Sequence, residues 1–235
     1  MIKDATLLRL FTILFFIGLR FVGASQSTEI TVRFIGNCGL YMTDGLSNIY
    51  IDFPYKSGAH NYMEYDLKEL DNVQNNPIFI YTHKHSDHYS GKLVKRLAKK
   101  LDGAYYTPWS IKSMMKLNGK IPDFKIEAFK TRHIFSINHY SYLITWHGKK
   151  IFISGDTEHS ETLAAQSDVD WVFLPAWLLM EAVRNDVPLR EVGKMFAVYH
   201  IGPLDNINIT GEKIIMLDKQ GRIISIPIES NPLVE

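Results

Sequence analysis

The segment from residue 77 to residue 88 reads PIFIYTHKHSDH, a short apolar run followed by three histidines and an aspartate. Residues 77–81 are apolar and partly β-branched, which predicts a buried strand. The heptad 82–88 therefore lies on the loop that leaves a core strand, where functional residues are concentrated. Because imidazole and carboxylate groups bind zinc, iron or manganese, the segment predicts a metal site.

The spacing of these side chains divides them into two groups. In an extended loop, side chains at positions i and i+2 point the same way, so His83 and His85 can bind one ion together. Asp87 and His88 follow where the chain is expected to turn into a helix, and they can face a second ion. The alternative is a polar surface cluster without metal. We disfavour it because two further histidines and an aspartate occur downstream where a two-metal site needs them.

The heptad after an apolar strand resembles the metallo-β-lactamase superfamily, whose remaining ligands are a histidine, an aspartate and a histidine at the ends of later strands. The matching positions here are His133, Asp156 and His200. Asp156 lies in a Gly-Asp-Thr triplet, which resembles the branch with ascorbate-phosphate lactonase-like and phospholipase D-like members. The resemblance covers the chain from about Ile30 to the C-terminus.

This resemblance implies an α/β fold, a four-layer αββα sandwich with a binuclear site at one edge between the two sheets. It implies two divalent metal ions, zinc foremost, with manganese or iron as alternatives. A hydroxide shared by the two ions would be the nucleophile. One ion would be held by His83, His85 and His133, the other by Asp87, His88 and His200, with Asp156 bridging both.

The resemblance also narrows the activity to a metal-dependent hydrolase that cleaves a small ester, lactone or phosphodiester. Zinc β-lactamases usually have cysteine at the bridging position, so Asp156 argues against penicillin turnover as the main role. A nuclease of the same superfamily is one alternative, and a non-catalytic metal-binding or interaction protein that keeps the fold is another. A two-iron redox role is disfavoured because that branch usually has glutamate where His85 stands.

Two roles in the site stay open. Asp87 is expected to orient the hydroxide as well as bind metal, but the general acid is not defined by any motif. His159, three residues after Asp156, is one candidate and His139 is another. His139 also competes with His133 as the third ligand of the first ion; we prefer His133 because its spacing of 23 residues to Asp156 resembles the family better.

The N-terminus has the pattern of a secretory signal peptide over residues 1–24, so we expect an exported, periplasmic or secreted protein with a hydrolase domain at 25–235. Basic residues precede a ten-residue apolar run, which is short for a spanning helix, although an uncleaved membrane anchor is the alternative. Without residues 1–24 the chain has 23 basic and 24 acidic side chains, a net charge of −1. That balance disfavours nucleic acid as a partner and leaves a small-molecule substrate; the oligomeric state stays undefined.

Elsewhere the periodicity predicts alternating strands and helices. Strands are expected at 30–35, 40–43 and 47–53, with a hairpin at Asp44-Gly45. A helix with a basic outer face should follow the heptad, and another should run from Glu181 to Val192 with a break at Pro188. Residues 214–217 and 222–228 are expected to form a terminal hairpin. Asp52 ends the third strand; in the family an aspartate there supports the metal loop, and a plain strand-ending carboxylate is the alternative.

Overall fold

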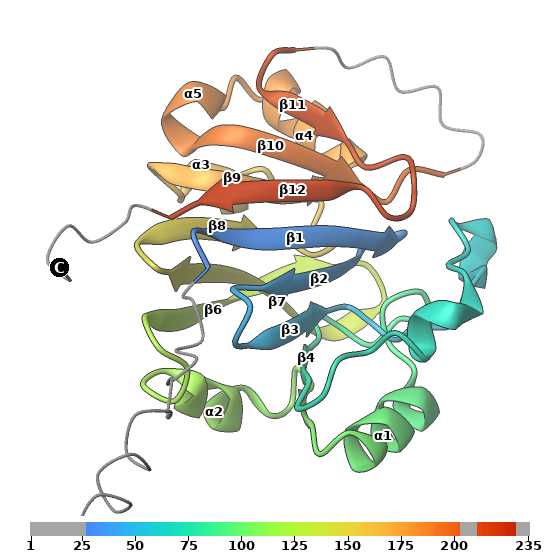
Figure 1. Cartoon of the computed structure of the whole chain (residues 1–235). Helices are drawn as coiled ribbons and strands as arrows, with labels where there is room; N and C mark the ends of the chain where they lie inside the picture. The colour runs from blue at the N-terminus through green and yellow to red at the C-terminus, as the bar shows by residue number, and fades with distance from the viewer. Residues whose placement is uncertain (1–26, 203–210, 229–235) are drawn as a thin grey trace, which may run out of the picture.

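The computed structural model describes residues 27–202 and 211–228, so the predicted signal peptide lies outside the described residues. Two six-stranded sheets face each other and helices cover their outer faces (Figure 1). The four layers are those that the sequence predicted. Within the described residues, no helix is long and apolar enough to cross a membrane.

The first sheet has the order β12-β1-β2-β3-β4-β5. Antiparallel pairing joins β12, β1, β2 and β3, and parallel pairing joins β3, β4 and β5. The strands are β1 (Glu29–Gly36), β2 (Gly39–Thr43), β3 (Asn48–Ile51), β4 (Ile78–Ile80), β5 (Ala104–Tyr106) and β12 (Ile223–Pro227).

The second sheet has the order β11-β10-β9-β8-β7-β6. Here β6, β7 and β8 pair antiparallel, and β8 to β11 pair parallel. The strands are β6 (Phe124–His133), β7 (Ser136–Trp146), β8 (Lys149–Ile153), β9 (Val169–Pro175), β10 (Gly193–Tyr199) and β11 (Ile214–Met216).

Alternation along the strands divides the apolar residues between the layers. In β10, Ala197 and Tyr199 face the core between the sheets, whereas Phe196 and Val198 face the outer helices. In β3, Tyr50 likewise joins the outer cluster of the first sheet. Each sheet is therefore buried on both faces over most of its area, as the layered architecture requires.

The helices cover these outer faces. The helix α1 (Gly91–Lys100) packs on the first sheet through an apolar stripe while its lysines face outward, as predicted. On the second sheet lie α3 (Glu161–Ala164), α4 (Ala176–Arg184) and α5 (Leu189–Val192). The prediction of a helix over 181–192 was wrong at its start, because α4 begins at Ala176, directly after β9. The remaining helical segments are α2 (Ile111–Met114), η1 (Ala59–Asn61), η2 (Leu67–Leu70) and η3 (Met115–Leu117).

The predicted terminal hairpin was also wrong. The strand β11 pairs with β10 in the second sheet, and β12 pairs with β1 in the first, so the two strands belong to different sheets. A local hairpin would satisfy the two strands with each other but would leave β1 and β10 with open edges. The observed crossing completes both edges instead.

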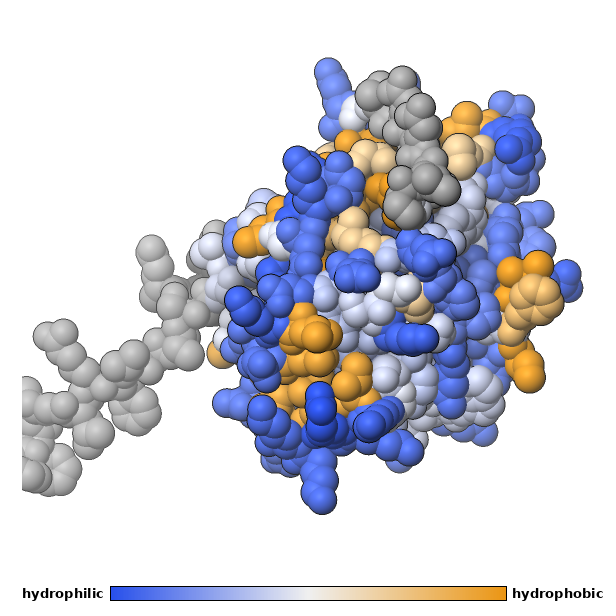
Figure 2. Space-filling view, turned by 90° about the vertical axis from the view of Figure 1, so that its right-hand side faces the viewer, coloured by the Kyte–Doolittle hydropathy of each residue, from blue (hydrophilic) through white to orange (hydrophobic). Residues whose placement is uncertain are grey.

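This topology gathers the loops that carry the predicted ligands. The parallel strands β3 and β4 end at the same edge of the first sheet, and β6, β8 and β10 end together in the second. Both sets of ends meet on the right-hand side in Figure 1. Figure 2 looks onto this edge, where orange apolar patches interrupt a largely hydrophilic surface.

Candidate metal centre

The predicted heptad lies in the loop between β4 and α1. His83 and His88 are fully buried and Asp87 is nearly so. The backbone turns tightly here, because the amides of His88 and Tyr89 both donate to the carbonyl oxygen of His85, at 3.0 and 2.9 Å. The helix itself begins only at Gly91, so the expected helical turn at Asp87 and His88 is a tight turn instead.

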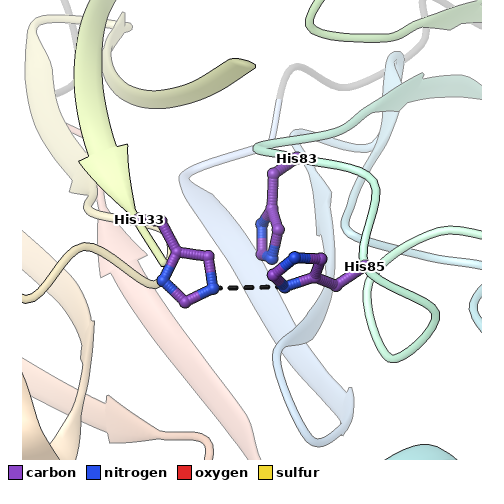
Figure 3. A group of neighbouring side chains, drawn as sticks. All are labelled: His83, His85 and His133. Carbon is purple, nitrogen blue, oxygen red and sulfur yellow. Dashed lines mark hydrogen bonds between the residues drawn. The ribbon is translucent and has the colours of Figure 1, made fainter. Parts of the chain in front are cut away.

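The first group of ligand atoms comes from His83, His85 and His133, which lie within 4.8 Å of one another. Figure 3 shows the three rings converging, two from the heptad and one from the end of β6. The His133 Nε2 lies 3.2 Å from His85 Nδ1. The other nitrogen of His133 lies 2.8 Å from Glu158 Oε1, which orients the ring. The structure thus brings together the three histidines that the sequence assigned to one ion.

The second group consists of Asp87, His88, Asp156 and His200, all buried and with ligand atoms within 4.8 Å of one another. Asp156 Oδ2 lies 2.9 Å from His88 Nε2 and 3.0 Å from His200 Nε2. Asp87 Oδ2 lies 3.1 Å from His200 Nε2 and 3.8 Å from His88 Nε2. Tetrahedral ligands about 2.0–2.1 Å from zinc are about 3.4 Å apart, so these separations suit one cation.

Hydrogen bonds from residues outside the ligand groups orient the rings of His83 and His88 so that their lone pairs point into the site. The amide and hydroxyl of Thr82 both donate to Asp52, at 2.8 and 2.7 Å. The hydroxyl oxygen can then accept from His83 Nδ1, 3.0 Å away. Asp52 Oδ2 also accepts from His88 Nδ1 at 2.9 Å. With hydrogens on both Nδ1 atoms, each Nε2 presents a lone pair to the site.

Several buried atoms have no hydrogen-bond partner among the described residues. His83 Nε2 and Asp156 Oδ1 are buried and accept no hydrogen bond from the described residues. Leaving such atoms unsatisfied costs free energy, and a bound cation would satisfy both. Burial lowers the pKa of His83 and keeps it neutral, as a ligand must be. The histidine and carboxylate set therefore fits divalent transition metals.

The charges of the second group also favour a cation. Burial opposes a charged His88, but the carboxylates of Asp156 and Asp52 outweigh it and raise the pKa of His88 well above its usual value. Burial likewise opposes ionisation of Asp156, yet His200 and His88 hold the pKa of its carboxyl well below the usual range. Positive charge is therefore stabilised between these side chains.

His139 lies beside the site but faces the backbone. Its Nε2 accepts from the amide of Asp156 at 2.8 Å, and its Nδ1 lies 2.6 Å from Thr131 Oγ1. Gly155 makes this approach possible, since it has a φ of +61° and a Cβ there would lie 2.6 Å from His139 Nε2. The Gly-Asp-Thr triplet thus places Asp156 through its glycine, and His139 belongs to neither ligand group.

The structure does not bring His159 to the cleft. Its side chain is 47% exposed and its nearest carboxylate is Glu161, 3.9 Å away. The cleft, of about 550 Å³, is lined by five of the predicted ligands, His85, Asp87, His133, Asp156 and His200, together with residues to which the sequence analysis gave no role. These are His60, Tyr62, Ile134, Glu158, Trp177, Met180, Glu181 and Arg184. They lie on separate loops and helices that form no recognised sequence motif. Glu158 differs in that it directly follows the Gly-Asp-Thr triplet.

Comparisons with known proteins define the fold. No protein-family model and no curated protein matches this sequence. In structure the chain is similar to Igni18, a metallo hydrolase from Ignicoccus hospitalis, with a TM-score of 0.61 and 15% identity over 86% of this chain and 100% of that chain. It is similar to the metallo-β-lactamase fold protein YhfI from Bacillus subtilis, with a TM-score of 0.55 and 13% identity over 84% and 99%.

An isothiocyanate hydrolase from Delia radicum gut bacteria has a TM-score of 0.56 and 14% identity, over 84% of this chain and 99% of that chain. These likenesses show that the chain has the metallo-β-lactamase fold, which the sequence resemblance predicted. They span nearly the whole length of each neighbour.

Proposed function

We propose that this chain is a binuclear metal-dependent hydrolase acting on a small ester, lactone or phosphodiester. The observation that carries the proposal is the pair of ligand groups at one edge of the sandwich, with buried lone pairs left unpartnered. That the solved neighbours Igni18 and the isothiocyanate hydrolase are described as hydrolases supports the reaction class.

The assignment of residues follows from which atoms are free. His83, His85 and His133 would hold one cation, and Asp87, His88 and His200 the other. Asp156 would bridge them, because its Oδ2 faces His88 and His200 while its buried Oδ1 has no partner in the part of the chain that the structure describes. Zinc is the first choice, with manganese or iron as alternatives.

The two cations, when bound, lower the pKa of a shared water and polarise the substrate oxygen under attack. The carboxylate of Asp87 lies between the second ligand group and the cleft wall. Its Oδ2 faces His200, and its Oδ1 lies 3.9 Å from His60 Nε2 at the cleft wall. A carboxylate in that position can orient the nucleophile by hydrogen bonding.

The cleft wall supports a small substrate with an apolar part. Ile134, Trp177 and Met180 form an apolar wall, whereas Tyr62 and Arg184 contribute polar groups. Leaving-group protonation needs a side chain within reach of the cleft. His60 lines the cleft and satisfies that requirement, whereas His159 is not among the residues that line it.

The test combines metal analysis with turnover. Protein purified without chelator should contain about two transition-metal ions per chain by elemental analysis. It should hydrolyse at least one member of a panel of chromogenic esters, lactones and phosphodiesters. Chelator should abolish turnover, and added zinc or manganese should restore it. Full turnover after removal of the metal would overturn the proposal.

The Asp87→Ala variant separates chemistry from folding. Asp87 lies on a loop outside the hydrophobic clusters, so we expect turnover to fall by about 100-fold or more while the fold persists. The matched control is Asp170→Asn, a carboxylate at the sheet surface remote from the ligand groups. Bound metal without turnover in the wild type would favour a non-catalytic metal-binding protein.

We also propose that the protein is exported with residues 1–24 removed. The basis is the basic and apolar pattern of that segment. N-terminal sequencing of protein from the extracytoplasmic fraction should begin at Ser25. An intact Met1 in a membrane fraction would favour the anchor instead.

A further inference from the structure

The turn between β6 and β7 carries an unusual concentration of exposed apolar side chains. Ile134, Phe135 and Ile137 are 62%, 93% and 86% exposed. Single exposed hydrophobic residues are common on soluble proteins, but three within four positions at the tip of a hairpin form a patch. Packing against the described part of the chain does not explain why these three side chains are apolar, because they are exposed.

The backbone gives no reason for a phenylalanine in this turn. Phe135 has a φ of +57°, in the left-handed region that asparagine and glycine enter readily and bulky residues rarely adopt. Its carbonyl oxygen lies 3.4 Å from His85 Nε2, so the turn is tied to the proposed metal site through the backbone. The side chain itself points away from the protein surface, which suggests a binding role outside the chain.

The surroundings of the tip combine aromatic and basic groups. Trp109 is 56% exposed, and its Nε1 lies 3.1 Å from the side-chain oxygen of Asn138 in the favoured amide orientation. Lys84 Nζ lies 4.1 Å from the centre of the Trp109 ring. Lys130 and Arg132 are exposed on β6, and among the described residues neither forms an ion pair. An apolar tip bordered by an indole and free cations matches the chemistry of a bilayer interface.

We infer that the 134–137 hairpin tip inserts into the interfacial layer of an anionic lipid bilayer. Phe135 and Ile137 would enter the boundary between headgroups and acyl chains, and Lys130, Arg132 and Lys84 would face the lipid phosphates. The carboxylate of Glu158, which lies 2.8 Å from His133 Nδ1, is one negative charge against these three cations.

The position of the tip favours a bilayer over a substrate in the cleft as the partner that covers Phe135 and Ile137. Ile134 lines the cleft, but Phe135 and Ile137 lie outside the residues that line it. A small molecule in the cleft would leave both side chains in water. Insertion would bury them and turn the cleft mouth toward the lipid surface. This inference concerns binding only and holds whether or not the chain is a hydrolase.

The test measures vesicle binding by the full chain. Vesicles of equal parts phosphatidylcholine and phosphatidylglycerol are compared with vesicles of phosphatidylcholine alone, by co-sedimentation. The variant is Phe135→Asn combined with Ile137→Thr, since asparagine tolerates the positive φ and threonine suits a strand. The matched control is Leu46→Ser, an exposed leucine in the β2–β3 turn at the opposite end of the sandwich. Any binding by the N-terminal apolar segment is common to all these proteins.

We expect the wild type and Leu46→Ser to bind anionic vesicles more tightly than neutral ones, and less tightly as salt rises. The double variant should bind about 100-fold more weakly, about tenfold for each apolar side chain. Brominated lipid should quench more indole fluorescence in a Phe135→Trp variant than in the wild type, whose four tryptophans set the baseline. Equal vesicle binding by the double variant and the wild type would overturn the inference. So would a Phe135→Trp variant quenched no more than the wild type. A wild-type dimer that the double variant abolishes would also overturn it, since a second copy would then cover the tip.

Discussion

Replacing Asp52 by asparagine should weaken the binding of both metal ions, although Asp52 belongs to neither proposed ligand set. Asp52 is buried and accepts three hydrogen bonds, from the amide and hydroxyl of Thr82 and from His88 Nδ1. Through the Thr82 hydroxyl it also fixes the hydrogen on His83 Nδ1. One carboxylate therefore sets the tautomer of a histidine in each ligand group.

An amide at position 52 would reverse these hydrogen bonds. Its oxygen can still accept from the amide of Thr82, but its NH2 group would replace the oxygen that faces the Thr82 hydroxyl and His88 Nδ1. Both of those groups would then have to accept hydrogens. His83 and His88 would be driven toward the tautomer with hydrogen on Nε2, the atom that each offers to the metal.

The expected magnitude follows from the role of such outer partners. Loss of a partner that orients a ligating histidine typically costs 10–100-fold in metal affinity, or about 1.4–2.7 kcal/mol per ion. The measurement is competition against a chromophoric chelator of known affinity, which resolves the two binding steps. Asp170→Asn is the control, because Asp170 also accepts hydrogen bonds from a backbone amide and a side chain, at Lys150 and Lys194. If Asp52→Asn binds metal as tightly as Asp170→Asn, the tautomer argument fails.

Three further outcomes test the site and the fold. His133→Ala should remove one ion from the protein by elemental analysis, whereas His139→Ala should retain both with reduced stability; the reverse result would exchange their roles. Gly155→Ala should lower the free energy of unfolding of metal-free protein by about 2–4 kcal/mol in urea, because it combines left-handed strain with a clash at His139. Burial raises the pKa of Asp44, but hydrogen bonds from the His147 side chain and two backbone amides outweigh it and lower that pKa overall. The stability from Asp44 should therefore be complete above about pH 4 and lost as pH falls through its folded pKa, so wild type and Asp44→Asn should converge in acid.

Much of the candidate site could be predicted from the sequence because its information is local. The apolar run before the heptad identifies a buried strand, and the spacing of His83, His85, Asp87 and His88 places four side chains on one short loop. In the structure, His83 and His85 belong to one ligand group, and Asp87 and His88 belong to the other. The continuous apolar run in β10 likewise indicates a strand buried on both faces, as in layered α/β proteins.

The errors concern partners that are distant in the sequence. Nothing in residues 214–228 distinguishes a local hairpin from two strands that complete different sheets, since alternation fixes which face is buried but not which edge is paired. The early start of α4 was missed for a similar reason: Trp177 to Met180 are apolar, and only packing against β9 and β10 shows that they form a helix.

The sequence by itself determined the chemistry of the ligands, the strand that delivers them and the Gly-Asp-Thr triplet that contains Asp156. Only the tertiary structure decided that His133 rather than His139 converges with His83 and His85, that His159 lies outside the cleft, and that Asp52 serves both ligand groups. The physical reason is that residue type and spacing set what a side chain can bind and which way it points along its own segment. Which side chains meet depends on how two sheets stack and on where their strands end, and those contacts join residues far apart in the chain.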